Sequence, residues 1–252
     1  MPNIWQVIFF SLIGGVFSLI GGIILLANKK VNKIAAYASA FAAGALLSAA
    51  FVDLLPEAIE SGSDTHQVML FTMIGVIAFY LLEGFINWFH RHDDNEKEHS
   101  PAIIPMIIIG DTLHNALDGV AIAAGFLISP TSGIIVTLAI ATHEIPQEIG
   151  DFGILLNHGM SKKKTILVNI LSALSSTLVA VVCYIIGDTT NISLAPLMGI
   201  IAGFFIYIAA SDIIPTLHHE RNRKAFVKKT IWLILGAVLV TVAIMTLHGF
   251  VE

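Results

Sequence analysis

The feature that most constrains this sequence is a series of eight apolar runs, each long enough to cross a lipid bilayer. A transmembrane helix needs about 20 apolar residues to span the hydrocarbon core. Because the connections are short, we expect one transmembrane domain over residues 1–252. The sequence predicts an all-α membrane protein with about eight transmembrane helices. The predicted spans are 4–27, 34–56, 67–89, 101–128, 131–157, 165–187, 193–215 and 230–249.

The distribution of basic residues supports eight spans and predicts their orientation. All 13 lysines and arginines fall in alternate connections, after spans one, three, five and seven. Seven or nine spans would break this alternation. Basic loops are retained on the cytoplasmic side of a membrane, so both termini are expected outside. We expect an integral protein of the plasma (inner) membrane.

Composition excludes several classes of protein. Charged residues make up 12% of the chain, about half the share of a soluble domain. The basic clusters lack interleaved aromatic residues, so we expect the lipid bilayer as a partner and no nucleic acid. The single cysteine, Cys183, excludes an internal disulfide and a thiolate metal cluster. The sequence leaves a homodimer open.

A short repeat relates two of the spans. Spans two and seven share glycine, aspartate and proline at equal spacing, nine residues from glycine to aspartate and three from aspartate to proline. The matched residues are Gly44, Asp53 and Pro56 in span two, and Gly203, Asp212 and Pro215 in span seven. The two spans cross in opposite directions, which predicts an inverted repeat of helices 1–3 and 6–8 around helices 4–5. Inverted repeats of this kind underlie many secondary transporters.

Polar residues concentrate in the fourth span. The segment reads Gly110-Asp-Thr-Leu-His-Asn-Ala-Leu-Asp-Gly119. Asp111, His114 and Asp118 follow a three- and four-residue spacing that places them on one helical face. Asn115 points to the adjacent angle.

The fifth span carries a second polar set, in the segment Thr142-His-Glu-Ile-Pro-Gln-Glu-Ile-Gly-Asp151. His143 and Gln147 form one pair four residues apart, and Glu144 and Glu148 form another, which Asp151 extends. Each charge at the bilayer centre costs about 2.5 kcal/mol or more. Imidazole, carboxylate and carboxamide together make a shell suited to a first-row divalent metal ion, which would neutralise the buried carboxylates.

These two segments resemble a known family. His114-Asn-Ala-Leu-Asp-Gly119 and His143-Glu-Ile-Pro-Gln-Glu148 are similar to the paired signatures of the ZIP (zinc/iron permease) transporters. The resemblance implies transport of divalent transition-metal ions into the cytoplasm through a site between helices four and five. Zn²⁺ is the first expectation as transported substrate, with Cd²⁺, Fe²⁺ and Mn²⁺ as alternatives. The implied metal ligands are His114, Asn115, Asp118, His143, Glu144 and Gln147.

The sequence departs from that pattern at Gln147, where the most similar subfamily usually has histidine. Glutamine can bind a metal through its carbonyl oxygen, but more weakly and without charge. This departure argues against a second tightly bound ion.

Further residues are candidates for the ion pathway or for a secondary metal site. They are Asp53, Asp111, Glu148, Asp151, Asp212 and the loop histidines His90, His92 and His99.

Two other functions are compatible with the sequence. An intramembrane metal-dependent hydrolase is suggested by His143-Glu-Ile-Pro-Gln147, which resembles the zinc-protease pattern His-Glu-x-x-His. The second histidine of that pattern is missing, so we do not expect an enzyme. A proton/cation exchanger is the other alternative, since the fifth span is rich in acidic residues.

Overall fold

The computed structural model describes residues 3–27, 31–61, 64–91, 103–190 and 193–248, and these residues are helical apart from short connections. No strand occurs within these ranges. The helices are α1 (Ile4–Ala27), α2 (Val31–Ser48), α3 (Leu55–Glu60), α4 (Thr65–Arg91), α5 (Ile103–Ile128), α6 (Pro130–Asn157), α7 (Lys162–Thr189), α8 (Ala195–Tyr207), α9 (Ile214–His218) and α10 (Arg223–His248), with two π-helical segments, η1 (Ala49–Leu54) and η2 (Ile208–Ile213).

Each predicted span has a helical counterpart, which confirms the all-α membrane fold. Spans two and seven are each continuous helical rods in which a π segment joins two α-helices: α2–η1–α3 and α8–η2–α9. The clearest boundary error is α10, which begins at Arg223 rather than at residue 230. The helix continues past the apolar stretch because long basic side chains can extend from it into water while their stems stay on apolar surface.

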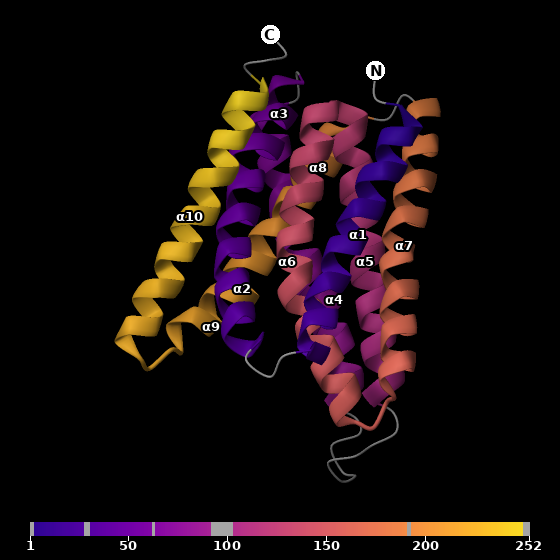
Figure 1. Cartoon of the computed structure of the whole chain (residues 1–252). Helices are drawn as coiled ribbons and strands as arrows, with labels where there is room; N and C mark the ends of the chain where they lie inside the picture. The colour runs from indigo at the N-terminus through magenta and orange to yellow at the C-terminus, as the bar shows by residue number, and fades with distance from the viewer. Residues whose placement is uncertain (1–2, 28–30, 62–63, 92–102, 191–192, 249–252) are drawn as a thin grey trace.

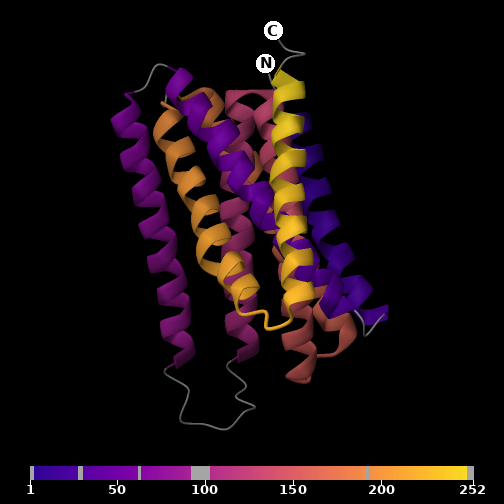
Figure 2. The same ribbon diagram turned by 90° about the vertical axis from the view of Figure 1, so that its left-hand side faces the viewer.

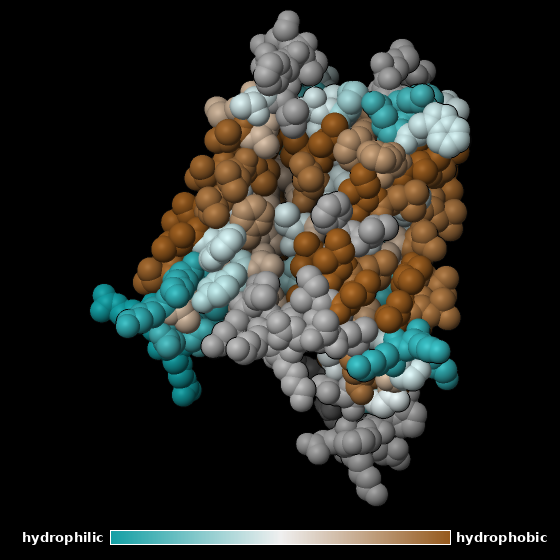
Figure 3. All heavy atoms as spheres, in the orientation of Figure 1, coloured by the Kyte–Doolittle hydropathy of each residue, from teal (hydrophilic) through white to brown (hydrophobic). Residues whose placement is uncertain are grey.

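The outer surface is that of an integral membrane protein. Six of the described helical rods are long and apolar enough to cross a bilayer. On the face that Figure 3 shows, apolar side chains cover much of the middle of the molecule, and hydrophilic side chains gather toward its two ends. The first residues of α1 and the last residues of α10 lie at the same end of the molecule (Figure 1). The α6–α7 and α9–α10 connections lie at the other, which we call the basic end because Lys162–Lys164 and Arg221–Lys229 lie there.

The helices pack as two groups. In the first, α5 packs on α7 and α6, and α1 packs on α6 and α7. In the second, α2 packs on α10 and α4 packs on α8, as Figures 1 and 2 show from two sides. We call these the α5–α6 bundle (α1, α5, α6, α7) and the α2–α8 bundle (α2, η1, α3, α4, α8, η2, α9, α10). The contact of α2 with α6 is the main link between them.

Glycines bring the helices of the α2–α8 bundle into backbone contact. A Cβ atom on Gly44 would collide with the main chain of α10, and one on Gly203 would collide with the main chain of α4. The partner helices present their own glycines: Gly236 of α10 faces α2, and Gly75 of α4 faces α8. Small residues permit this close approach where lipid provides no hydrophobic drive for helix association. The two contacts are equivalent under the predicted repeat.

The π segments add stronger support for the repeat. Both are six residues long, and both begin five residues after the matched glycine, at Ala49 and at Ile208. In each, the residue after the segment donates its N–H to a carbonyl five residues earlier, Leu55 to Ala50 and Ile214 to Ala209. Pro56 and Pro215 follow the two segments and cannot donate to the carbonyl four residues before them, so each removes one α-helical hydrogen bond next to the wider turn. π turns of this kind occur often at functional sites.

Candidate metal centre

Four side chains from α5 and α6 converge in the middle of the molecule. His114 and Asp118 lie one turn apart on α5, and His143 and Glu144 are neighbours on α6. Ser129 alone separates the two helices. Its Oγ accepts a hydrogen bond from the N–H of Ser132, which lies in the first turn of α6. Because this connection is so short, α5 and α6 are antiparallel neighbours, and residues at similar distances from it face each other.

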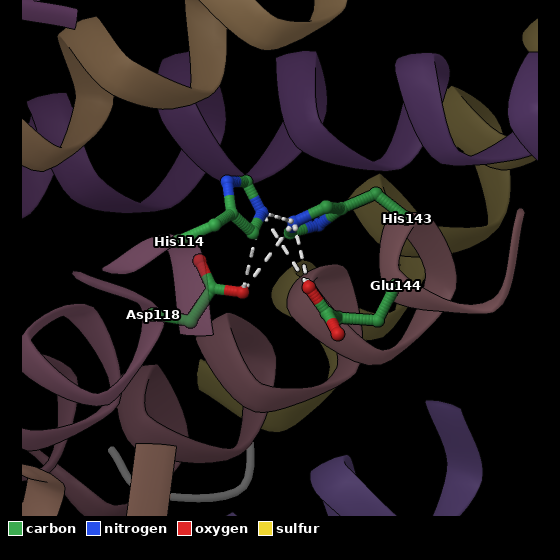
Figure 4. Close-up of side chains that lie close together, drawn as sticks. All are labelled: His114, Asp118, His143 and Glu144. Atoms are coloured by element: carbon green, nitrogen blue, oxygen red, sulfur yellow. Dashed lines mark hydrogen bonds and ion pairs between the residues drawn. The ribbon is translucent and has the colours of Figure 1, made fainter. Parts of the chain in front are cut away.

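Figure 4 shows the four ligand atoms pointing toward one another. Nε2 of His114 lies 3.2 Å from Nε2 of His143, 3.4 Å from Oε1 of Glu144 and 3.7 Å from Oδ2 of Asp118. Nε2 of His143 lies 3.5 Å from the same Asp118 oxygen and 4.0 Å from the same Glu144 oxygen. A tetrahedral zinc ion with bonds of about 2.1 Å holds its ligand atoms about 3.4 Å apart. These five separations, from 3.2 to 4.0 Å, are near that value, and one ligand atom from each of the four residues lies within 4.8 Å of the others, so the group could hold one small divalent ion.

Burial makes this cluster costly without a cation. Asp118, His143 and Glu144 are each at most 5% exposed. No hydrogen bond among the described residues reaches Oδ2 of Asp118 or either carboxylate oxygen of Glu144. Carboxylates buried in a medium of low dielectric require a compensating charge. A dication among the four atoms would supply that charge, and imidazole and carboxylate suit zinc and its first-row neighbours.

The backbone orients one of the ligands. Nδ1 of His143 lies 3.3 Å from the carbonyl oxygen of Ala139. A carbonyl only accepts hydrogen bonds, so this contact places the imidazole proton on Nδ1. Nε2 then presents its lone pair to the cluster, as metal-binding histidines held by an outer hydrogen bond do.

The structure places Asn115 in a neighbouring network and not among these four side chains. Its Nδ2 donates to Oδ1 of Asp111 at 3.0 Å, to the main-chain oxygen of Asp111 at 3.1 Å and to Oγ of Ser172 at 3.2 Å. Asn115 is buried, and its bond to Ser172 links α5 to α7. Sequence reasoning singled out no role for Ser172.

Gln147 lies where two cavities meet the cluster. A cavity of about 230 Å³ is lined by His114 and Gln147, and a second of about 190 Å³ by His143 and Gln147. Ile208, the first residue of η2, also lines both. Pro146 lines the second cavity. The helix α6 continues on both sides of this proline without interruption.

The other acidic candidates on α5 and α6 lie outside the four-residue group. Asp111 accepts the Asn115 hydrogen bond, as described above. Glu148 is fully buried, and neither of its carboxylate oxygens receives a hydrogen bond from the described residues. Asp151 is half-buried.

The remaining predicted residues are spread over the chain. Asp53 is buried in η1, where the Ser132 hydroxyl donates to its Oδ1 at 3.4 Å. The backbone of Asp212 lies in η2. The side chains of Asp212 and His90, and all of His92 and His99, lie outside what the structure describes.

Sequence reasoning did not place Glu83 among the site residues, although it lies beside the cluster. Glu83 of α4 lines the larger cavity together with His114 and accepts a hydrogen bond of 2.6 Å from the Tyr207 hydroxyl. An acidic residue inside an otherwise apolar run was the available signal. The sequence could not show that Glu83 lies next to α5.

Comparison with known proteins places the chain among metal transporters. Residues 4–105 and 90–244 match the family described as ZIP Zinc transporter. Zinc transporter ZIP13 of Pongo abelii is 30% identical over 213 residues, covering 79% of this chain and 63% of the relative. Human Zinc transporter ZIP10 is 34% identical over 145 residues, covering 52% of this chain and 17% of the relative.

Zinc transporter ZIP10 of Danio rerio is 40% identical over 114 residues, covering 45% of this chain and 14% of the relative. The aligned segments thus span only about a sixth of the length of the ZIP10 proteins. The family match, in contrast, extends over almost the whole of this chain. The chain belongs to the ZIP zinc transporter family.

Proposed function

We propose that this protein carries a divalent transition-metal ion, zinc foremost, across the membrane into the cytoplasm. The observation that supports this most strongly is the convergence of His114, Asp118, His143 and Glu144 at metal-ligand separations inside a membrane protein. Two imidazoles favour zinc, iron, nickel or copper over magnesium and calcium. The relatives named as zinc transporters favour zinc within that set. Cd²⁺, Fe²⁺ and Mn²⁺ are the other candidate substrates.

The proposed direction of transport is taken from the resemblance to the ZIP transporters, and the charge distribution supplies the topology. The basic end is cytoplasmic by the positive-inside rule, which leaves both termini outside. The cavity beside His114 includes Gly110, one turn closer to the basic end on α5. An ion leaving in that direction would enter the cytoplasm. The plasma (inner) membrane is the proposed location.

Alternating access is the proposed mechanism. The four cluster residues all belong to the α5–α6 bundle, while Ile208, on both cavities, belongs to the α2–α8 bundle. Movement of one bundle relative to the other would open the cluster to each side in turn. In this proposal residues 1–252 act as a single transport domain.

Asn115 and Gln147 complete the proposed ligand set. Gln147 would act from the walls of the two cavities and Asn115 from its position behind the cluster. Since both are uncharged amides, their contribution to metal affinity is smaller than that of the carboxylates, and the set favours a single bound ion. An intermediate affinity suits transport, because the ion must also leave.

Flux of ⁶⁵Zn²⁺ into proteoliposomes tests this function. The native protein should take up zinc, and His143→Ala should not. His158→Ala is the matched control, because this histidine lies at the exposed end of the same helix with its Nδ1 near the Ile154 carbonyl, and it should transport normally. A native protein that moves none of Zn²⁺, Cd²⁺, Fe²⁺ and Mn²⁺ would overturn the proposal and favour the metal-dependent hydrolase.

A further inference from the structure

A polar pocket lies at the basic end of the α2–α8 bundle, outside the metal centre. Its volume is about 560 Å³, within the range of about 300–1,000 Å³ typical of small-molecule sites. The first turns of α2 contribute Ala36 and Tyr37 to its wall. The polar residues that line it come from the α9–α10 connection and from the first turns of α10. They are Glu220, Asn222, Lys224, Lys228 and Lys229.

The charge of this pocket is positive. Three lysines and one glutamate line it, which leaves an excess of two positive charges. Nζ of Lys229 lies 2.9 Å from Oε2 of Glu220, so this pair is neutral. Lys224 and Lys228 are exposed, and no ion pair among the described residues reaches either of them. Their ammonium groups are therefore available to an anion from outside the protein.

The two lysines stand at the foot of an exposed apolar stripe on α10. Lys224 and Lys228 are one turn apart, and the stripe continues from them at spacings of four and three residues, which share one helical face. Its members, each 38–51% exposed, are Trp232, Leu235, Leu239 and Val242. In Figure 3 hydrophilic side chains lie where α10 begins, and apolar side chains follow along the helix. Since α10 is the least buried of the six candidate spans, the stripe is available to lipid.

Aromatic residues place the pocket at the level of the membrane surface. The ring of Tyr37 is stacked on that of Trp232 at 6.4 Å, and the ring of Phe41 lies edge-on to Trp232 at the same distance. Tyrosine and tryptophan are enriched where the hydrocarbon core meets the headgroups. A molecule with an anionic head and apolar tails matches both the pocket and the stripe, whereas a soluble anion matches only the pocket.

We propose that the pocket binds the headgroup of an anionic phospholipid whose acyl chains lie along the apolar stripe of α10. The lipid phosphate would pair with the ammonium groups of Lys224 and Lys228. Basic pockets between transmembrane helices on the cytoplasmic side recognise anionic headgroups in this way. The positive-inside rule assigns the basic end to that side. This inference concerns a surface outside the metal centre and does not depend on transport.

Fluorescence of Trp232 reports which lipid occupies the stripe. Trp5→Phe with Trp88→Phe leaves Trp232 as the one tryptophan of the full-length protein. This protein is reconstituted in mixtures of phosphatidylcholine and phosphatidylglycerol, in which one lipid carries brominated acyl chains that quench a tryptophan on contact. Quenching should show about a tenfold preference for phosphatidylglycerol, which corresponds to about 1.4 kcal/mol. Addition of Lys224→Gln and Lys228→Gln should reduce the preference to about twofold.

Lys162→Gln with Lys163→Gln, in the same single-tryptophan protein, is the matched control. It removes the same charge from the same end of the molecule, at exposed positions in the first turn of α7. Figure 1 shows α7 and α10 on opposite sides of the molecule. The tenfold preference at Trp232 should therefore remain. Equal losses in the two double variants would show a general attraction of anionic lipid to the basic end and would overturn the pocket.

Three further outcomes would also overturn the proposal. Equal quenching by the two brominated lipids before any lysine is changed would show that the stripe does not select anionic lipid. Loss of the preference on adding inorganic phosphate, at an ionic strength matched with chloride, would assign the pocket to a soluble anion. Weak quenching by both lipids would show that protein, such as a second copy of this chain, covers the stripe.

Discussion

The two bundles differ in the side chains that they bury. The α5–α6 bundle buries a large set of polar side chains, among them Asp118, His143, Glu144 and Glu148. The α2–α8 bundle is held by glycine contacts, with Gly44 and Gly203 against neighbouring main chains. Close glycine contact is not confined to one bundle, because a Cβ atom on Gly119 of α5 would also collide with the main chain of α7. What distinguishes the α5–α6 bundle is that the four side chains that could hold a metal ion all come from it. The difference teaches that stability and metal binding can be perturbed separately.

The largest effect should come from breaking a glycine contact. Gly203→Leu would drive a side chain into the main chain of α4, and we expect a loss of about 3 kcal/mol or failure to fold. The thermal midpoint and size-exclusion profile in detergent measure this. Gly84→Ala is the control, because nothing lies within 4 Å of its Cβ position, and alanine should stabilise the helix by roughly 0.5–1 kcal/mol. Equal behaviour of the two variants would contradict the glycine-contact account.

The next effect is stabilisation by metal, which should depend on the α5–α6 bundle. At a free zinc concentration one hundred times the Kd, binding should stabilise the native protein by about 2.7 kcal/mol. Calorimetry with zinc and with a chelator measures the shift. Asp118→Asn, which keeps the shape but removes a charge from the cluster, should lose most of it. An unchanged zinc shift in Asp118→Asn would exclude the four-residue group as the site.

A smaller effect is expected at Gln147, which lies beside both cavities. Gln147→Glu adds a charged oxygen ligand at nearly constant shape, so zinc affinity should rise about tenfold, or about 1.4 kcal/mol. The maximal transport rate should fall, because a tighter ion leaves more slowly. Titration calorimetry and flux at saturating zinc measure the two quantities. A faster rate at unchanged affinity would argue against a ligand role for Gln147.

The smallest effect should come from Ser172→Ala. This change removes one of the acceptors of the Asn115 amide while the Asp111 oxygens remain, so the loss of stability should be about 1 kcal/mol or less. Zinc affinity should not change if Ser172 only supports Asn115 from behind. A loss of affinity beyond about threefold would show that this network orients the metal ligands.

The fold was predictable from sequence to an unusual degree because the membrane narrows the choices. Any spanning segment must satisfy its backbone hydrogen bonds internally, so an apolar run of sufficient length predicts a helix. The repeat was visible as a spacing of glycine, aspartate and proline. Its structural expression as two π segments was not, because the wider turn depends on how each rod packs around its proline. The early start of α10 at Arg223 was missed because apolarity marks the hydrocarbon core and not the end of a helix.

The candidate site, like the fold, was predictable from the sequence only in part. The spacing of His114 and Asp118 predicts a shared helical face, and the structure brings both beside His143 and Glu144. The spacing could not show that the Asn115 amide nitrogen faces Asp111 and Ser172, since that depends on where α7 packs. Glu83 lay in an apolar run with no partner in the nearby sequence.

The sequence by itself determined the all-α membrane fold, the glycine–aspartate–proline spacing, the family and the two motif segments, since each depends on residue type and local spacing. Only the tertiary structure decided which helices share a bundle, which four ligand atoms converge and that Glu83 lines the cavity of His114. The physical reason is that in lipid the side-by-side arrangement of helices is decided by close packing between distant segments, such as Gly75 against α8. Local spacing carries no information about those contacts.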